Sequence, residues 1–218
     1  MKLRFLALAM CAFSFAQAQN VQSAAEAEAA YLKVVTGRAA KIVEKIGLND
    51  TAKFTRVCSI IAFQYRDLNA IHDERNAALA TLKKDTVSTD KEAKIKAAEN
   101  TADAKLYALH CAYVGKLLSE LTPEQVEQVK DGMTYGVAPL TYRVHLEMIP
   151  TLTEAQKRYM WAALCEAREH AMDAESSEKK HWWFGKYKGR INNYLAKEGY
   201  DLKKERVEWG KREAAKKK

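Results

Sequence analysis

Proline, the residue that most often interrupts a helix, is nearly absent from this chain of 218 residues. Only Pro123, Pro139 and Pro150 occur, and no stretch alternates apolar and polar residues in the manner of a β-strand. Alanine, glutamate, lysine and leucine, which are all good helix formers, are abundant. We therefore expect an all-α fold, arranged as an elongated helical bundle.

Two long segments carry apolar residues at helical spacing. The first begins near residue 50, where Asn49 or Asp50 can cap it, and the second runs from about Thr89 to Leu118. Thr89 and Glu92 have the spacing of a capping box at the start of the second segment. Because only the polar stretch 83–88 separates the segments, we expect a long antiparallel helix hairpin.

The pattern Leu-Thr-x-x-Gln occurs twice, at residues 121–125 and 152–156. A threonine followed three residues later by a glutamine forms a capping box, so each copy predicts the start of a helix. We expect further helices at 177–197 and, short and charged, after Asp201. With the helix at the second motif they make a C-terminal three-helix region, whereas residues 133–150 form the least regular segment.

The first 18 residues have the pattern of a secretory signal peptide. Lys2 and Arg4 precede an apolar run that is too short to span a bilayer, and Ala16-Gln17-Ala18 matches a cleavage site. No later segment is apolar enough for a transmembrane helix. We therefore expect export to the periplasm or to the outer surface of the cell.

The remaining chain is predicted to be a single helical domain, residues 19–218. Its first part, 19–120, contains the long helices, and its second part, 121–218, contains the C-terminal helices and a basic tail. The length of 200 residues suffices for one good core or two small ones.

Basic residues are concentrated at the C-terminus, where residues 177–218 contain 14 Lys and Arg but 6 Asp and Glu. The final Lys216-Lys217-Lys218 is typical of a solvated tail, and a nucleic-acid interface would have a broader basic stripe. Together with export, this argues against nucleic acid as a partner.

Three cysteines lie outside the predicted signal: Cys58, Cys111 and Cys165. An odd number cannot pair completely within the chain, and each has apolar neighbours at helical spacing. We interpret them as small buried apolar residues.

The helix predicted at 177–197 carries an unusual density of aromatic and basic residues. Helical spacing places Phe184, Ile191 and Leu195 on one apolar face, flanked by aromatic and cationic side chains. A tryptophan on the opposite face needs either a packing partner or a ligand. Aromatic side chains can stack on sugar rings, and arginine and asparagine can form directional hydrogen bonds, so the helix is a predicted carbohydrate site. The alternative is a packing interface between domains. The candidate ligand-binding residues of the chain are Trp182, Trp183, Lys186, Tyr187, Arg190, Asn193, Tyr135, Arg66, His72, Glu166 and His170.

Two residue pairs in the helices predicted after residue 152 can be explained either by function or by packing. Glu166 and His170 lie at i and i+4, so they could act together in acid–base chemistry or form a salt-bridged face with Arg168. Gly185 and Gly189 predict close approach of another helix or of a ligand. No residue is predicted to be catalytic, none is predicted to bind a metal, and no cofactor is expected, although an enzyme acting on glycans remains an alternative.

Five segments resemble one known family: 64–75, 121–135, 148–156, 166–174 and 181–204. It is a secreted, all-helical family of unknown function from Bacteroidetes-type bacteria. Its members often accompany polysaccharide-degradation systems, and sugar binding has been suggested for it. The resemblance implies a carbohydrate-binding accessory of polysaccharide utilisation, with no established site residues.

The two Leu-Thr-x-x-Gln units also resemble those of small periplasmic helical stress proteins. This second resemblance implies a chaperone-like or stress function. The two hypotheses differ in what they require of the structure: a concave site lined by the aromatic helix for carbohydrate, or an open apolar surface elsewhere for a chaperone.

Overall fold

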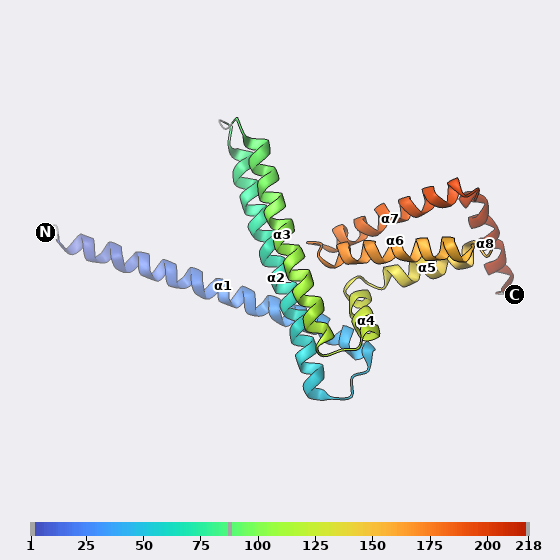
Figure 1. Cartoon of the computed structure of the whole chain (residues 1–218). Helices are drawn as coiled ribbons and strands as arrows, with labels where there is room; N and C mark the ends of the chain where they lie inside the picture. Colours follow the sequence, from blue (N-terminus) through green and yellow to red (C-terminus); the bar gives the residue numbers. More distant parts are fainter. Residues whose placement is uncertain (1–2, 87–88, 217–218) are drawn as a thin grey trace. The chain divides into compact units, whose positions relative to one another are not determined.

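The computed structural model describes the backbone of residues 3–86 and 89–216, and the side chains of 25–86 and 89–216. It confirms the all-α prediction, because no strand occurs in these ranges. The predicted signal peptide, 1–18, lies outside the residues whose side chains are described, so it stays a prediction. No helix in the described part has both the length and the apolar character needed to cross a membrane. The helices are α1 (Leu3–Ile46), α2 (Thr51–Lys84), α3 (Lys91–Leu118), α4 (Pro123–Met133), α5 (Val137–Met148), α6 (Glu154–Met172), α7 (Ser177–Lys197) and α8 (Leu202–Lys216) (Figure 1).

The chain divides into two compact units, Met1–Asp67 and Leu68–Lys218, and the division falls inside α2. The single-domain prediction stays a prediction. In the first unit, α1 ends before Gly47, whose φ of 73° lets the chain turn into α2. The backbone N–H of Lys53 donates to Asp50 Oδ1 at 3.0 Å, which confirms Asp50 as the cap of α2.

In the second unit, the C-terminal half of α2 pairs with α3 in the predicted antiparallel hairpin. Lys105 Nζ lies 2.6 Å from a carboxylate oxygen of Glu74, and Lys91 Nζ donates to the carbonyl oxygen of Lys83 at 2.8 Å. The predicted capping box at Thr89 is wrong. Helix α3 begins one residue later than the box requires, with Asp90 at the N-cap and no side-chain capping bond.

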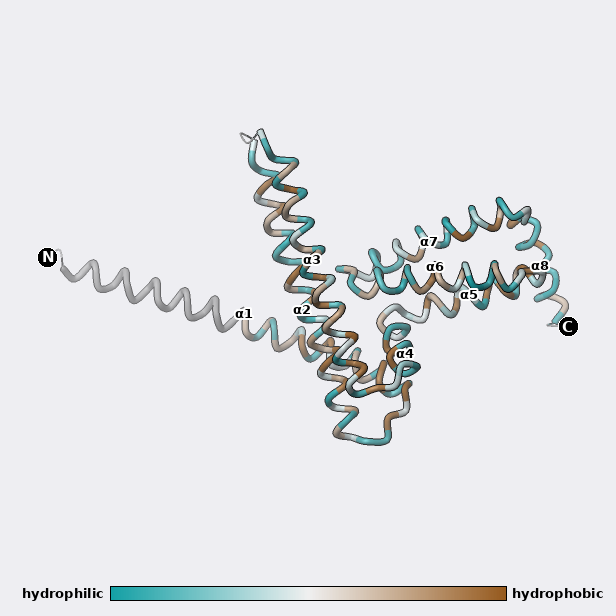
Figure 2. The backbone as a smooth tube through the Cα atoms, viewed as in Figure 1, coloured by the Kyte–Doolittle hydropathy of each residue, from teal (hydrophilic) through white to brown (hydrophobic). Residues whose placement is uncertain are grey.

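Helix α6 lies at the centre of the remaining helices and packs against α4, α5 and α7. Its apolar residues share a core with those of α5 and α7, whereas α8 contributes no fully buried residue and is mostly hydrophilic in Figure 2. Helices α6, α7 and α8 form the predicted C-terminal three-helix region. The core cluster comprises Ala138, Met148, Ile149, Leu152, Met160, Ala163, Leu164, Ala167, Ala171, Phe184, Tyr187, Ile191 and Leu195.

Helix α5 corrects the expectation that residues 133–150 are irregular. Tyr135 and Gly136 both adopt left-handed backbone conformations, with φ of 61° and 66°, and turn the chain from α4 into α5. Pro139 is compatible with a helix here because it stands in the first turn, where backbone N–H groups have no partner within the helix. Arg212 of α8 donates to the carbonyl oxygens of Glu147 and Met148 at the other end of α5.

Both Leu-Thr-x-x-Gln units form complete capping boxes, as predicted. The second glutamine has an additional role. Gln156 Oε1 lies 3.0 Å from the hydroxyl of Tyr200, and Gln156 Nε2 donates to Glu198 at 3.2 Å. The start of α6 is thereby joined to the end of α7.

A network of charged side chains joins α6 to α4. Arg168 is almost completely buried and bonds to Glu127 and, at 2.7 Å, to Asp131. Burial lowers the pKa of Arg168, but its hydrogen bonds to Asp131 and Glu127 outweigh this effect and hold the pKa above its ordinary value. The guanidinium is therefore permanently charged.

The same network extends to α3 through His110. Its Nδ1 lies 2.8 Å from Asp173 Oδ2, and its Nε2 lies 3.2 Å from Glu169 Oε2. Hydrogen bonds to Asp173 and Glu169 raise the pKa of His110 from 6.5 to about 10. The imidazole is thus a cation at neutral pH and bridges two carboxylates of the α6 C-terminal turn.

The cysteines agree only in part with their interpretation as buried residues. Cys58 is buried, Cys165 is partly exposed, and Cys111 is exposed. The prediction for Cys111 is wrong because Tyr113 and Leu117 occupy the inward face of α3 at that level.

Candidate ligand-binding face of α6 and α7

Helix α7 has the predicted bounds and the predicted apolar face. Its N-cap, Ser176, accepts a hydrogen bond from the backbone N–H of Lys179 at 3.1 Å. Phe184, Ile191 and Leu195 are buried in the core shared with α6. This packing fixes the rotation of α7 and turns its aromatic and basic residues toward the rim of the α6–α7 contact and toward solvent.

One end of this rim is built from aromatic rings. The indole of Trp183 stacks on the imidazole of His170, with ring centroids 4.3 Å apart and planes 13° from parallel. Trp182 meets Trp183 edge-on at 5.0 Å, and 53% of Trp182 remains exposed. The ammonium of Lys186 lies over both indole rings, 4.8 Å from that of Trp183.

The middle of the rim is organised by Glu166 of α6. The Tyr187 hydroxyl donates to Glu166 Oε1 at 2.7 Å, and Arg190 Nη1 donates to Oε2 at 2.9 Å. The hydrogen bond from Tyr187, followed by that from Arg190, holds the pKa of Glu166 below its ordinary value. Burial and the same carboxylate raise the pKa of Tyr187 to about 12. Glu166 is therefore an ionised acceptor that fixes two side chains of α7.

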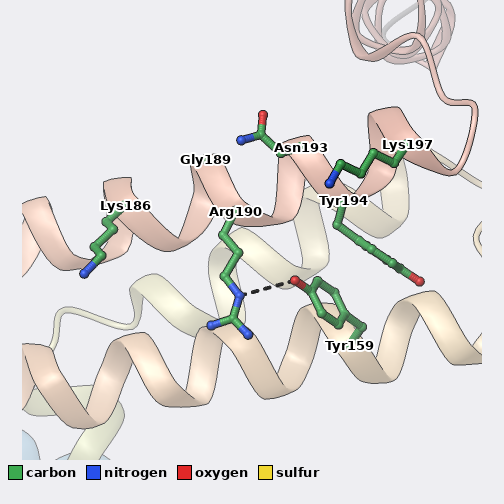
Figure 3. A pocket seen from close by; sticks show the side chains of 7 residues that line it. All are labelled: Tyr159, Lys186, Gly189, Arg190, Asn193, Tyr194 and Lys197. Carbon is green, nitrogen blue, oxygen red and sulfur yellow. Dashed lines mark hydrogen bonds between the residues drawn. The ribbon is translucent and has the colours of Figure 1, made fainter.

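Beyond Arg190 the rim opens into a surface pocket of about 530 Å³ (Figure 3). The rings of Tyr159 and Tyr194 lie 4.0 Å apart, and Arg190 Nε donates to the Tyr159 hydroxyl at 3.3 Å. We call this feature the tyrosine pocket; its lining residues are Tyr159, Lys186, Gly189, Arg190, Asn193, Tyr194 and Lys197.

Most candidate residues from the sequence meet along this rim. We call it the α6–α7 stripe, and it consists of Tyr159, Glu166, His170, Trp182, Trp183, Lys186, Tyr187, Arg190, Asn193, Tyr194 and Lys197. Tyr159, Tyr194 and Lys197 were missing from the predicted site. The signal for Tyr159 was its position seven residues before Glu166, which is two helical turns along the same face of α6.

Three candidates lie elsewhere. Tyr135 is exposed and stacks on His181, the residue before the tryptophan pair, at 5.5 Å between ring centroids. His72 is buried, and its Nε2 lies 2.7 Å from the carbonyl oxygen of Asp173. Arg66 belongs to the first compact unit, where it pairs with Asp67 at 2.7 Å. We therefore leave His72 out of the candidate site, and a ligand-binding role of Arg66 stays a prediction.

The structure also bears on the alternatives for this region. Arg168 pairs with Glu169 on α6 at 3.6 Å and with Asp131 on α4, so the salt-bridged face forms in part, but Glu166 is not a member of it and pairs with Arg190 on α7. Close helix packing at Gly185 and Gly189 is wrong, because an added Cβ at either position meets nothing within 4 Å. Gly189 instead lines the tyrosine pocket, where the missing side chain leaves the helix backbone accessible.

The family described as "Protein of unknown function (DUF3826)" matches residues 32–215, and the chain belongs to this family. The match extends from α1 almost to the end of α8 and includes every residue of the α6–α7 stripe. None of the curated proteins matches the chain.

Proposed function

We propose that this protein is an exported, carbohydrate-binding accessory of polysaccharide utilisation, and that it binds an oligosaccharide along the α6–α7 stripe. The observation that carries the proposal is the row of aromatic rings and hydrogen-bonding groups along α7, from the exposed Trp182 to the exposed Lys197. Aromatic faces stack on the C–H surfaces of sugar rings, while guanidinium, ammonium and amide groups bond to hydroxyls in fixed directions.

The spacing of the stripe supports a linear ligand. Its residues recur at 182/183, 186/187, 190, 193/194 and 197, so that each turn of the helix contributes at least one. A turn rises about 5.4 Å, which is close to the length of one pyranose ring. Consecutive sugar units of an extended chain can therefore meet equivalent groups along the helix.

The stripe is also held in place before any ligand arrives. Glu166 fixes Tyr187 and Arg190, and the stack on His170 fixes the plane of Trp183. Side chains that are already ordered lose little conformational freedom on binding, which favours affinity.

The alternatives receive less support. An internal packing interface would cover the stripe, yet 53% of Trp182 is exposed. The chaperone-like function was inferred from the Leu-Thr-x-x-Gln units, and both units act as capping boxes that start α4 and α6. Helix capping explains these units without any partner.

The test is a titration of the protein without its first 18 residues against a panel of plant and host oligosaccharides. Tryptophan fluorescence serves as the screen, and isothermal titration calorimetry measures the affinity of each hit. We expect Trp183→Ala to weaken binding by about fivefold, since stacking of one ring on an aromatic side chain contributes about 1 kcal/mol.

The matched control is Trp161→Ala. Trp161 lies on α6 and is 37% exposed, but it contacts Tyr142 of α5 and is not part of the stripe. Far-UV circular dichroism of both variants checks that the helices persist. Equal losses in the two variants, or the absence of binding across the whole panel, would contradict the proposal.

A further inference from the structure

The tyrosine pocket combines aromatic walls with an excess of positive charge. Three of its lining residues are cations, Lys186, Arg190 and Lys197, and none is a carboxylate. These positions are one and two helical turns apart on α7 and so lie on one face of the helix. In Figure 3 Arg190 extends toward Tyr159 and Lys197 lies beside Tyr194, whereas the Lys186 ammonium points away from the two tyrosines.

The charges of this pocket are only partly neutralised by the protein itself. Glu166 compensates Arg190, since the two groups are 2.9 Å apart. Neither Lys186 nor Lys197 is paired with a carboxylate among the residues that the structure describes. Glu198, the acid next to Lys197 in the sequence, accepts a hydrogen bond from Gln156. Two ammonium groups thus remain to attract an anion.

The tyrosine rings limit the kind of anion that fits. Tyr159 and Tyr194 form a tilted pair with centroids 4.0 Å apart, and Asn193 adds an amide at the opening. The volume of about 530 Å³ is in the range of small-molecule sites, which extends from roughly 300 to 1,000 Å³. A small inorganic anion would leave most of this space and the aromatic surface without contacts, whereas an acidic sugar has both a ring face and a charge.

Building on the proposed function, we propose that the tyrosine pocket selects an acidic sugar unit, and that Lys197, next to Tyr194, binds its carboxylate or sulfate. Lys186, whose ammonium lies over the two indole rings, adds a second positive charge at the other end of the pocket. The sugar ring lies against Tyr159 and Tyr194, and Asn193 bonds to its hydroxyls. Ammonium groups are suited to this task because each carries three rotatable donors and accepts either anion geometry. The rest of the stripe binds neighbouring sugar units irrespective of their charge.

The experiment uses isothermal titration calorimetry with two matched pairs of oligosaccharides. The first pair is an oligogalacturonate and its methyl ester, and the second is a sulfated oligosaccharide and its desulfated form. In each pair the backbone is the same and only the charge differs. We expect the acidic member of at least one pair to bind about tenfold more tightly than its neutral form at low ionic strength.

The double variant Lys186→Gln/Lys197→Gln is expected to bind the acidic and the neutral member of that pair with equal affinity, because the amide side chains carry no charge. Lys188→Gln is the matched control, because Lys188 is exposed on α7 but does not line the pocket. The pair that shows the preference identifies carboxylate or sulfate as the recognised group.

Three results would overturn the inference. Equal affinity within both pairs would show sugar binding without charge selection, and the proposed function would survive. An equal loss in Lys188→Gln would show general attraction to a basic helix and not recognition in the pocket. Failure of every acidic and neutral oligosaccharide to bind would refute the proposed function together with this inference.

Discussion

Replacement of His110 by glutamine is expected to change how the stability of the protein depends on pH. In the folded protein the imidazole is held between Asp173 and Glu169, which raises its pKa from 6.5 to about 10. A group whose pKa is higher in the folded state binds its proton more tightly there, so protonation stabilises the fold. This stabilisation is complete below about pH 6.5 and is lost as the pH rises through about 10.

The size of the effect follows from the two pKa values. With 6.5 in the unfolded chain and about 10 in the folded protein, the contribution of His110 falls by about 2.5 kcal/mol between about pH 7 and about pH 9. Glutamine cannot carry the proton, so the variant lacks this part of the pH dependence. The difference in free energy of unfolding between wild type and His110→Gln should therefore shrink by this amount over the interval.

The assay is urea unfolding followed by far-UV circular dichroism, on both proteins, at the two pH values. Other groups that titrate in this range are common to the two proteins and cancel in the difference. A difference that stays constant within about 0.5 kcal/mol, which is the usual error of such comparisons, would refute the assignment of a charged His110 to this network.

Two further substitutions test the scaffold around the site. Arg168→Met should lower the free energy of unfolding by about 1–3 kcal/mol, because Glu127 and Asp131 lose charge-assisted hydrogen bonds; urea unfolding measures this, and unchanged stability would contradict it. Tyr135→Gly should be more stable than Tyr135→Ala by about 1 kcal/mol, because both remove the stack on His181 but only glycine relieves the left-handed backbone; equal melting temperatures would contradict this.

Elements with strong local signals were predictable from the sequence. Helix α7 has the predicted bounds because a serine cap, an apolar face of residues 184, 191 and 195, and Gly199 after its end all agree. The two capping boxes were predictable for the same reason: hydrogen bonds within four residues depend on the local sequence alone. Helix α5 was missed because Gly136 and Pro139 suggest a loop. Gly136 and Pro139 instead stand at the start of a helix, which is stabilised by the packing of Ala138 and Met148 in the core.

The candidate site was predictable mainly on the side of α7, with Glu166 and His170 as the predicted residues of α6. Helical spacing showed which of its residues share a face, but it could not show which residues of α6 lie opposite. Tyr159 was therefore missed, and the partner of Glu166 was left open between His170 and Arg168, whereas its ion-pair partner is Arg190. His72 illustrates the converse error, because a histidine in a polar stretch of helix suggested an accessible site, whereas the fold buries it against the backbone of Asp173.

Helix α6 explains how one small unit can have both a rigid scaffold and an accessible binding face. Tyr159, Glu166 and His170 recur at helical spacing and bond or stack with α7. Arg168 lies about half a turn away and bonds to α4, and Glu169 lies about a quarter of a turn from the middle of that face and bonds to α3. The ionic network thus restrains α6 from one side while the stripe occupies the other. Changes to Arg168 should consequently alter stability with little effect on oligosaccharide affinity, and changes to Trp183 should do the reverse; affinity lost in proportion to stability in both would show that the two faces are not separate.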